Sequence, residues 1–225
     1  MDKKINITLC CPSRGRPYYA KRMQDSALQT AKHPDKIKIK FYLNQDDPEL
    51  KNYQCIDYEV GIDRSTVMSW NLIAESSPSI MYMLVGDDAE FITKNWDQIF
   101  LDQYKKYPDG IFMIGTATGK HHGLIHKTSP HPVITQEWRN ALGYFWPVQF
   151  HHWCLDNYTN DLATQINRYI FLEDVMIKVK KITEDNTAKR IRTDAVNKRD
   201  LWVYEKTKQC YFEYDVAKLI KACNK

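Results

Sequence analysis

No apolar run in this chain of 225 residues approaches the ~18 residues of a membrane-spanning helix. The first apolar stretch, Ile5 to Cys11, is short and ends at a proline, which is not the pattern of a secretory signal. The six cysteines form no CxxC pair, and apart from the adjacent Cys10 and Cys11 they lie far apart. That spacing disfavours a zinc site and a disulfide framework. We therefore expect a cytoplasmic protein that does not contact a membrane.

The sequence also contains no internal repeat and no low-complexity linker, which favours one compact domain. Hydrophobic residues make up 43% of the chain, and this proportion is enough for an ordinary globular core. The formal net charge is only +4, which permits an anionic partner without requiring one. Composition therefore bounds the fold class but leaves the function open.

The most informative stretch runs from Ile80 to Phe91. It begins as a continuous apolar run, which predicts a strand buried on both faces of a sheet. The run stops at Gly86, and two adjacent carboxylates follow, Asp87 and Asp88. In open α/β sheets the carboxyl ends of the strands border the ligand crevice, so two acids there are placed to bind a divalent cation that in turn binds a diphosphate. The alternative interpretation is a turn in which one aspartate caps the next element.

Residues 1–115 alternate between strand-like and helix-like segments. Strands are predicted over 4–11, 37–43, 54–60, 80–91 and 110–115, and helices over 18–30, 63–76 and 96–107. This alternation predicts a single α/β domain with a mostly parallel central sheet flanked by helices.

The second half of the chain is less regular. Residues 116–132 have loop character and carry His121, His122 and His126, and a loop of this length inside a compact domain is usually functional or disordered. Beyond it, the sequence predicts a short strand leading into a helix over 133–142, a helix over 155–168, a strand within 169–180 and a closing helix over 211–223. Residues 178–199 are rich in lysine and arginine, which suits a polyanion such as DNA if the stretch is functional.

The polar groups that follow the predicted strands come in an order that resembles the GT-A fold of nucleotide-sugar-dependent glycosyltransferases. A Cys11–Pro17 segment follows the first strand, acids follow the second, an Arg-Asn pattern opens the helix after the third, and Gly86-Asp87-Asp88 follows the fourth. The resemblance implies that residues 1–115 bind the nucleotide sugar and that residues 116–225 form the acceptor side. The donor-binding residues that it implies are Pro12, Ser13, Arg14, Arg16, Asn44, Asp46, Asp47, Arg64, Asn71, Asp87 and Lys178.

The same resemblance implies a reaction. Asp88 would bind Mn²⁺ or Mg²⁺, and Asp156, or else Asp161, would be the base that deprotonates an acceptor hydroxyl. Many family members place a metal-ligand histidine on the strand after the base, but residues 175–180 contain none. A lysine there, Lys178 or Lys180, is expected to neutralise part of the leaving diphosphate instead. The implied enzyme is a hexosyl- or pentosyltransferase.

Small soluble enzymes of this kind occur in bacteriophages, where hydroxymethylated DNA bases are among the acceptors. A phage-encoded enzyme would work in the host cytoplasm on modified DNA, and the basic stretch 178–199 suits that acceptor. The resemblance therefore predicts a nucleotide-sugar donor and, as acceptor, a modified DNA base.

Two other functions share some of these features. A nucleotidyltransferase also has acids at its strand ends and a nucleotide pocket, but its usual glycine-rich loop with a lysine is missing after the first strand. A non-catalytic nucleic-acid-binding module would use the basic stretch as its main surface. Replacement of Asp88 separates these alternatives, because an enzyme loses its activity whereas a basic module keeps its binding.

Overall fold

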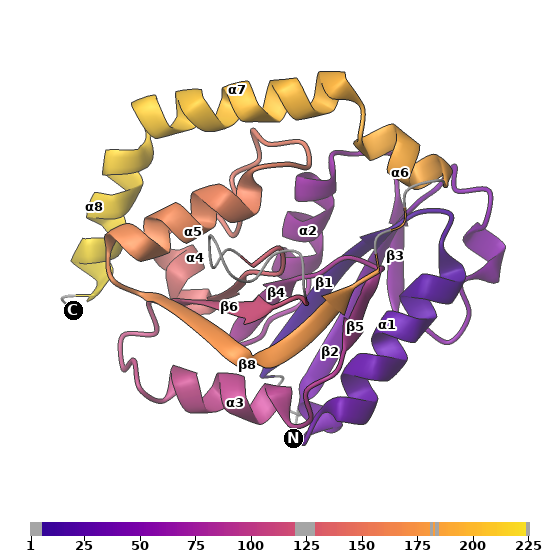
Figure 1. Ribbon diagram of the computed structural model, residues 1–225, viewed down its shortest axis with the longest axis horizontal. Helices are drawn as coiled ribbons and strands as arrows, with labels where there is room; N and C mark the ends of the chain where they lie inside the picture. The colour runs from indigo at the N-terminus through magenta and orange to yellow at the C-terminus, as the bar shows by residue number, and fades with distance from the viewer. Residues whose placement is uncertain (1–5, 120–128, 181, 183–184, 224–225) are drawn as a thin grey trace.

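Strand β1 (Ile7–Ser13) lies between β2 (Ile37–Asn44) and β4 (Met81–Leu84), and the three run parallel. β3 (Tyr58–Gly61) extends this parallel group beyond β2. The computed structural model describes residues 6–119, 129–180, 182 and 185–223. The parallel group brings the carboxyl ends of its strands to one edge of the sheet, as the alternation in the sequence predicts (Figure 1).

The sheet as a whole is mixed, so the prediction of a mostly parallel sheet is wrong. β7 (Val133–Thr135) lies between β4 and β6 (Met113–Ala117) and runs antiparallel to both, giving the order β3-β2-β1-β4-β7-β6-β8-β5. β5 (Ala89–Phe91) runs antiparallel to the end of β8 (Tyr169–Val179). Parallel neighbours need a long crossover, usually a helix. The stretch predicted as one strand over 80–91 instead breaks at Gly86 into two strands, β4 and β5. Too few residues separate them for a crossover, so β5 does not pair in parallel with β4.

Strand β8 bends and thereby has two neighbours. Its first half pairs parallel with β6, and its last residues pair antiparallel with β5. The register with β6 shifts between Leu172 and Met176, and an irregularity of this kind bends a strand and increases its twist. The bend curls the sheet and brings the end of β8 beside the strand that follows Asp88 (Figure 1).

Alternate side chains of the central strands form two apolar layers. Ile7 and Leu9 of β1 pack toward α1 (Pro17–Thr30) and α3 (Trp96–Tyr104), whereas Cys10 packs toward α2 (Thr66–Glu75). All residues of β4 are buried, which confirms the expected burial on both faces. The second layer is completed by α4 (Gln136–Leu142), α5 (Leu155–Gln165) and α8 (Phe212–Cys223), and two 3-10 helices, η1 (Pro34–Lys36) and η2 (Leu50–Asn52), flank β2.

The basic stretch contains two helices that its charge pattern did not predict. These are α6 (Asn186–Ile191), capped by Asp185, and α7 (Asp194–Cys210), capped by Thr193. In α7 the buried side chains are only Asp200, Val203 and Thr207, so apolar periodicity gives little signal. α7 lies across α5 and leads into α8 (Figure 1).

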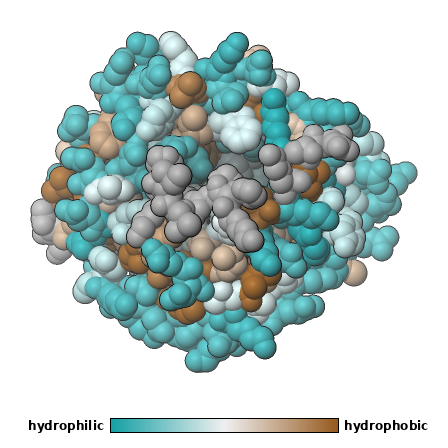
Figure 2. All heavy atoms as spheres, in the orientation of Figure 1, coloured by the Kyte–Doolittle hydropathy of each residue, from teal (hydrophilic) through white to brown (hydrophobic). Residues whose placement is uncertain are grey.

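The surface of the molecule is mostly hydrophilic on the face seen in Figure 2, where apolar atoms occur in small groups. Among the helices that the structure describes, none combines the length and the apolar character that a bilayer crossing needs. The six cysteines are free thiols, and Cys10 and Cys11 are buried in the two apolar layers.

The buried carboxylate of Asp200, on α7, accepts several backbone hydrogen bonds, and these predict a large contribution to stability. Its oxygens accept hydrogen bonds from the backbone N–H groups of His151, His152 and Trp153, at 2.9, 2.6 and 2.7 Å. Asp200→Ala leaves these buried donors unsatisfied, so we expect a loss of about 3–5 kcal/mol of unfolding free energy. Urea unfolding measures it, with the exposed Glu205→Ala of the same helix as the matched control. A loss below about 0.5 kcal/mol, typical of a surface substitution, would contradict the role of Asp200.

Candidate active site

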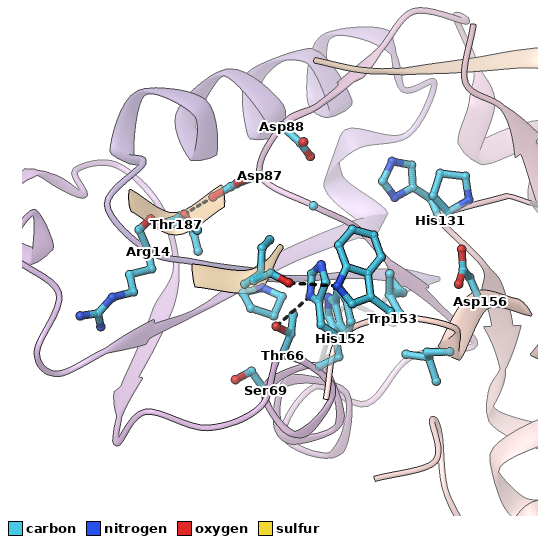
Figure 3. Close-up of a pocket in the computed structure, with 18 of the residues that line it drawn as sticks. Arg14, Thr66, Ser69, Asp87, Asp88, His131, His152, Trp153, Asp156 and Thr187 are labelled. Atoms are coloured by element: carbon cyan, nitrogen blue, oxygen red, sulfur yellow. Dashed lines mark hydrogen bonds between the residues drawn. The ribbon is translucent and has the colours of Figure 1, made fainter. Parts of the chain in front are cut away.

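A cavity of about 1120 Å³ opens at the carboxyl ends of β1, β2 and β4. The segment after β1 and the start of α2 form one wall, and α5 with the turn before it forms the opposite wall. α6 contributes the side between them. Figure 3 shows Asp87 toward Arg14 and Thr187, Asp156 near His131 on the far side, and Trp153 between these two groups.

The buried guanidinium of Arg16 joins two carboxylates at one end of the cavity. Its Nε and Nη2 donate to Asp185, at 2.6 and 2.8 Å, and its Nη1 donates to Asp87 Oδ1 at 3.0 Å. Ser13 Oγ donates to the other oxygen of Asp87 at 2.7 Å. Burial raises the pKa of Asp87 to about 6, although Arg16 and Ser13 both favour the ionised form. Arg16 and Asp87 therefore form an internal ion pair rather than a pair of groups directed at a ligand.

Asp88, the neighbour of Asp87, is half-buried and lines the cavity. Within the described part of the chain, no side chain donates a hydrogen bond to its carboxylate. Burial raises the pKa of Asp88, and the positive charges of Arg16, Arg192 and Arg22 oppose that shift. A Cβ on Gly86 would stand 2.6 Å from Asp88 Oδ1, so glycine is needed for this approach of the carboxylate to the backbone.

The end of β2 presents a different set of contacts from the one predicted. Asn44 Nδ2 donates to Asp63 Oδ1 at 2.6 Å, and Arg190 Nη2 donates to the same oxygen at 2.5 Å, which ties α6 to this wall. Asp46 forms a bidentate pair with Arg14 at the surface, at 2.5 and 3.0 Å. Asp47 is buried and accepts from the backbone of Gly15 and Glu49, so it shapes the turn.

The turn before α5 is held by Asp200 and presents two rings to the cavity. His152 Nδ1 lies 3.0 Å from Thr66 Oγ1, and burial lowers the pKa of His152 to about 4. Trp153 Nε1 donates to the carbonyl of Ile191 at 2.9 Å, so its indole is fixed against the end of α6. Asp156 follows in the first turn of α5 and lines the cavity.

The structure brings most of the predicted site residues to this cavity. Those that line it are Pro12, Ser13, Arg14, Arg16, Asn44, Arg64, Asp87, Asp88, Asp156 and Asp161. The remaining four, Asp46, Asp47, Asn71 and Lys178, are not part of the lining. Asn71 instead binds the backbone of Trp146 through both ends of its amide, and Lys178 is exposed on β8, paired in register with Glu90.

Asp161 lines the cavity, but its carboxylate is already bonded. Lys208 Nζ donates to Oδ2 of Asp161 at 2.7 Å, and the hydroxyl of Tyr204 donates to the same oxygen. Asp174, on the bend of β8, is exposed and outside the cavity. His121, His122 and His126 lie outside the described residues.

Few side chains in the cavity are available to bind a metal ion. In residues 6–119, 129–180, 182 and 185–223, no three His, Cys, Asp or Glu side chains come together as a metal site. Asp87 is bonded to Arg16 and Ser13, and His152 contacts Thr66, which leaves Asp88 as the carboxylate that faces the cavity at this end. One carboxylate fits a Mg²⁺-like ion whose other ligands are phosphate oxygens and water.

Several lining residues carry no sequence signal that marks them as functional. They include Thr66, Ser69, Trp70, His131 and Thr187. Arg190 and Arg192 also line the cavity, and they lie in the basic stretch, whose composition favours a solvated face over a binding site. Trp153 follows His151 and His152 in the sequence, and its position at the cavity depends on the Asp200 contact to its backbone and on the indole hydrogen bond to Ile191.

Solved structures of GT-A-type glycosyltransferases share this fold. The chain aligns over 97% of its length with 72% of a chain of TarS 1–349 from S. aureus in complex with UDP-GlcNAc, at 8% identity and a TM-score of 0.67. It aligns over 98% of its length with 74% of the mannosyltransferase PcManGT from Pyrobaculum calidifontis in complex with GDP-Man and Mn²⁺, at 11% identity and a TM-score of 0.63. The sequence itself matches no protein-family model and no curated protein. Identities this low show the GT-A fold, as the resemblance predicted, and not the reaction.

His152 generates a pH-dependent stability prediction. Its pKa is about 4 in the folded chain and ~6.5 when unfolded, so the unfolded state binds the proton more tightly. The stabilisation is present above the unfolded pKa and is lost as the pH falls toward 4. From pH 7 to pH 5 we expect this residue to remove on the order of 1–2 kcal/mol.

The opposite contribution of Asp87, whose raised pKa favours the fold at low pH, must be subtracted. Urea unfolding of the wild type and of His152→Asn at both pH values does so, because the variant keeps the Asp87 contribution. An equal loss of stability in both proteins on acidification would refute the role of His152.

Proposed function

We propose that this chain is a nucleotide-sugar-dependent glycosyltransferase that moves a hexosyl or pentosyl group to an acceptor hydroxyl. The observation that carries the proposal is the position of Asp88, at the end of β4 on a GT-A sheet edge. It faces a cavity with arginines on one side and Asp156 on the other. Residues 1–115 form most of the donor side and residues 116–225 the acceptor side, with α6 added to the donor side.

The donor end supplies positive charge for a diphosphate. Arg14, Arg64 and Arg192 line it, and Arg64 and Arg192 are exposed at its rim. Guanidinium groups bind phosphate oxygens through paired N–H donors, and they stabilise the charge that develops as the nucleoside diphosphate leaves. Arg16 acts indirectly, because its ion pair holds Asp87 and so fixes the backbone that carries Asp88.

A divalent cation, Mn²⁺ or Mg²⁺, would be held by Asp88 together with the donor's own phosphates. Such an ion supplies Lewis-acid stabilisation of the leaving diphosphate. Burial raises the pKa of Asp88, and a cation beside the carboxylate would offset that cost. The neighbour PcManGT is in complex with Mn²⁺.

Asp156 is the proposed general base at the acceptor end. It lies in the first turn of α5 and faces the cavity from the side opposite to Arg14 (Figure 3). A carboxylate there accepts the proton of an acceptor hydroxyl as the new glycosidic bond forms. Asp161 is the weaker candidate because Lys208 and Tyr204 bind its carboxylate.

The modified DNA base in a phage context, the cytoplasmic location and the two alternative functions stay predictions. Free thiols support a reducing compartment. The basic stretch is distributed over β8, α6 and α7, and two of its arginines are paired within the chain, Arg190 with Asp63 and Arg199 with Asp200. This distribution weakens the case for a dedicated nucleic-acid-binding module.

Replacement of Asp88 tests the donor site. A nucleotide sugar at ~100 times its Kd should stabilise the wild type by about 2.7 kcal/mol, seen as a rise in Tm. UDP-GlcNAc and GDP-Man are the first donors to test, each with and without Mn²⁺. We expect Asp88→Asn to keep its fold, to lose the Mn²⁺-dependent part of the Tm rise and to lose transfer. Asp102→Asn, on the exposed face of α3, is the matched control. Near-normal turnover of Asp88→Asn at saturating Mn²⁺ would refute the metal assignment.

Replacement of Asp156 tests the base. Asp156→Asn should lower the turnover number by ~10²-fold or more while leaving donor affinity nearly unchanged, because a general base acts on the acceptor proton and not on donor binding. Asp161→Asn is the comparison, and we expect a smaller loss of turnover because its carboxylate is already paired with Lys208. If Asp161→Asn were the more damaging change, the base would have to be reassigned to Asp161.

A further inference from the structure

The two ends of the cavity differ in charge. The guanidinium groups in its lining come from the segment after β1, the start of α2 and α6: Arg14, Arg16, Arg64, Arg190 and Arg192. Arg14, Arg16 and Arg190 are paired with aspartates, and Asp87 and Asp88 line the same end, so Arg64 and Arg192 supply its exposed positive charge. At the other end the lining consists of residues between 130 and 161, and within the described chain these include the carboxylates Asp156 and Asp161 but neither lysine nor arginine. Lys208 reaches Asp161 from outside the lining. A phosphate-bearing ligand fits the first end and is repelled at the second.

The second end has the side chains that recognise hydroxyl groups. Asp156, Asn157, Asn160 and Asp161 are spaced so that they lie on one face of α5, and all four line the cavity. Carboxylates accept hydrogen bonds from hydroxyls, and carboxamides both donate and accept them. Asn160 Oδ1 is buried and has no hydrogen-bond partner among the described residues. An acceptor atom of this kind costs free energy until a donor reaches it.

An aromatic surface lies beside this polar face. The indole of Trp153 is held by its hydrogen bond to the Ile191 carbonyl and packs edge-on against His152, with 4.8 Å between ring centroids. Trp153 is only half-buried and lines the cavity, so part of its ring is accessible to a ligand. Fixed aromatic rings next to a few placed polar groups are typical of small-ligand sites, and the apolar face of a sugar ring packs on such a ring.

We infer that the acceptor end of the cavity binds a neutral saccharide, through the polar face of α5 and the indole of Trp153. This inference rests on the proposed glycosyl transfer, because it names the acceptor of the same site. At about 1120 Å³ the cavity exceeds the usual range of ~300–1,000 Å³ for a single ligand, which leaves room for an acceptor beside the donor. A saccharide brings hydroxyls to Asp156 without bringing phosphates to the carboxylates.

Saturation-transfer NMR with the full chain and saturating UDP tests the inference. The probes are methyl glycosides of glucose, galactose, mannose and N-acetylglucosamine, and a duplex that contains 5-hydroxymethylcytosine. We expect at least one glycoside to bind, with an affinity that is unchanged between 50 and 200 mM salt because no phosphate is neutralised.

Two variants locate the saccharide. Asn160→Ala and Trp153→Ala should each weaken glycoside binding about tenfold, the effect of losing roughly one good contact. Trp202→Ala removes a tryptophan that is 59% exposed on α7, away from the cavity lining, and should leave binding unchanged. Calorimetric binding of UDP is measured on every variant to establish that the donor end is still folded. Trp153→Phe replaces Trp153→Ala if the latter fails this check.

The outcomes distinguish a failure of the saccharide inference from a failure of the proposed function. If UDP binds but no glycoside does, or if glycoside binding persists undiminished in Asn160→Ala and in the Trp153 variant, the saccharide inference is overturned and the glycosyltransferase proposal stands. The inference is likewise overturned if the modified duplex binds with a steep salt dependence and receives the sugar while no glycoside competes. If neither UDP-sugars nor GDP-sugars bind the wild type, the proposed function fails and the inference loses its premise.

Discussion

The cavity depends on the buried guanidinium of Arg16. It neutralises Asp87 at the end of β4 and Asp185 at the start of α6, two segments that lie far apart in the sequence. Removing one member of a buried ion pair leaves an uncompensated charge, which is strongly destabilising. The pair also separates the roles of two adjacent aspartates, because Asp87 is held inside and Asp88 is left to face the cavity.

Asp200 fixes the acceptor wall of the cavity, as Arg16 fixes the donor wall. Its carboxylate gathers three consecutive backbone N–H groups, and that geometry turns His152 and Trp153 toward the cavity. Both supports come from, or reach into, α6 and α7. Part of the charge in this region is therefore structural, whereas arginines at the cavity rim, such as Arg192, are exposed beside the site.

The sequence predicted the parallel half of the sheet because apolar runs and strand–helix alternation are local signals. It placed Asp88 at the cavity because the carboxyl ends of parallel strands have predictable positions, whereas Asp156 followed from the resemblance to the GT-A fold. It did not predict the antiparallel pairings of β5, β7 and β8, because register between distant strands leaves no local pattern. The position of a residue in the sequence also does not predict the direction in which its side chain points. Asp46 and Asp47 follow β2 as expected, yet one points to a surface arginine and the other into its own turn.

The separation along the chain between Arg16 and Asp185 has a consequence for biosynthesis. The ribosome completes α1 long before Asp185, the second carboxylate partner of Arg16, emerges, and β5 has no partner strand until β8 follows it. Contacts between such distant residues incur their loop-closure entropy before they contribute stability, which slows folding. A nascent chain that ends before β8 therefore holds Arg16 without its second carboxylate partner and leaves the edge of β5 open. In the cell, completion of the last third of the polypeptide would be the step that converts an interaction-prone intermediate into a protected fold.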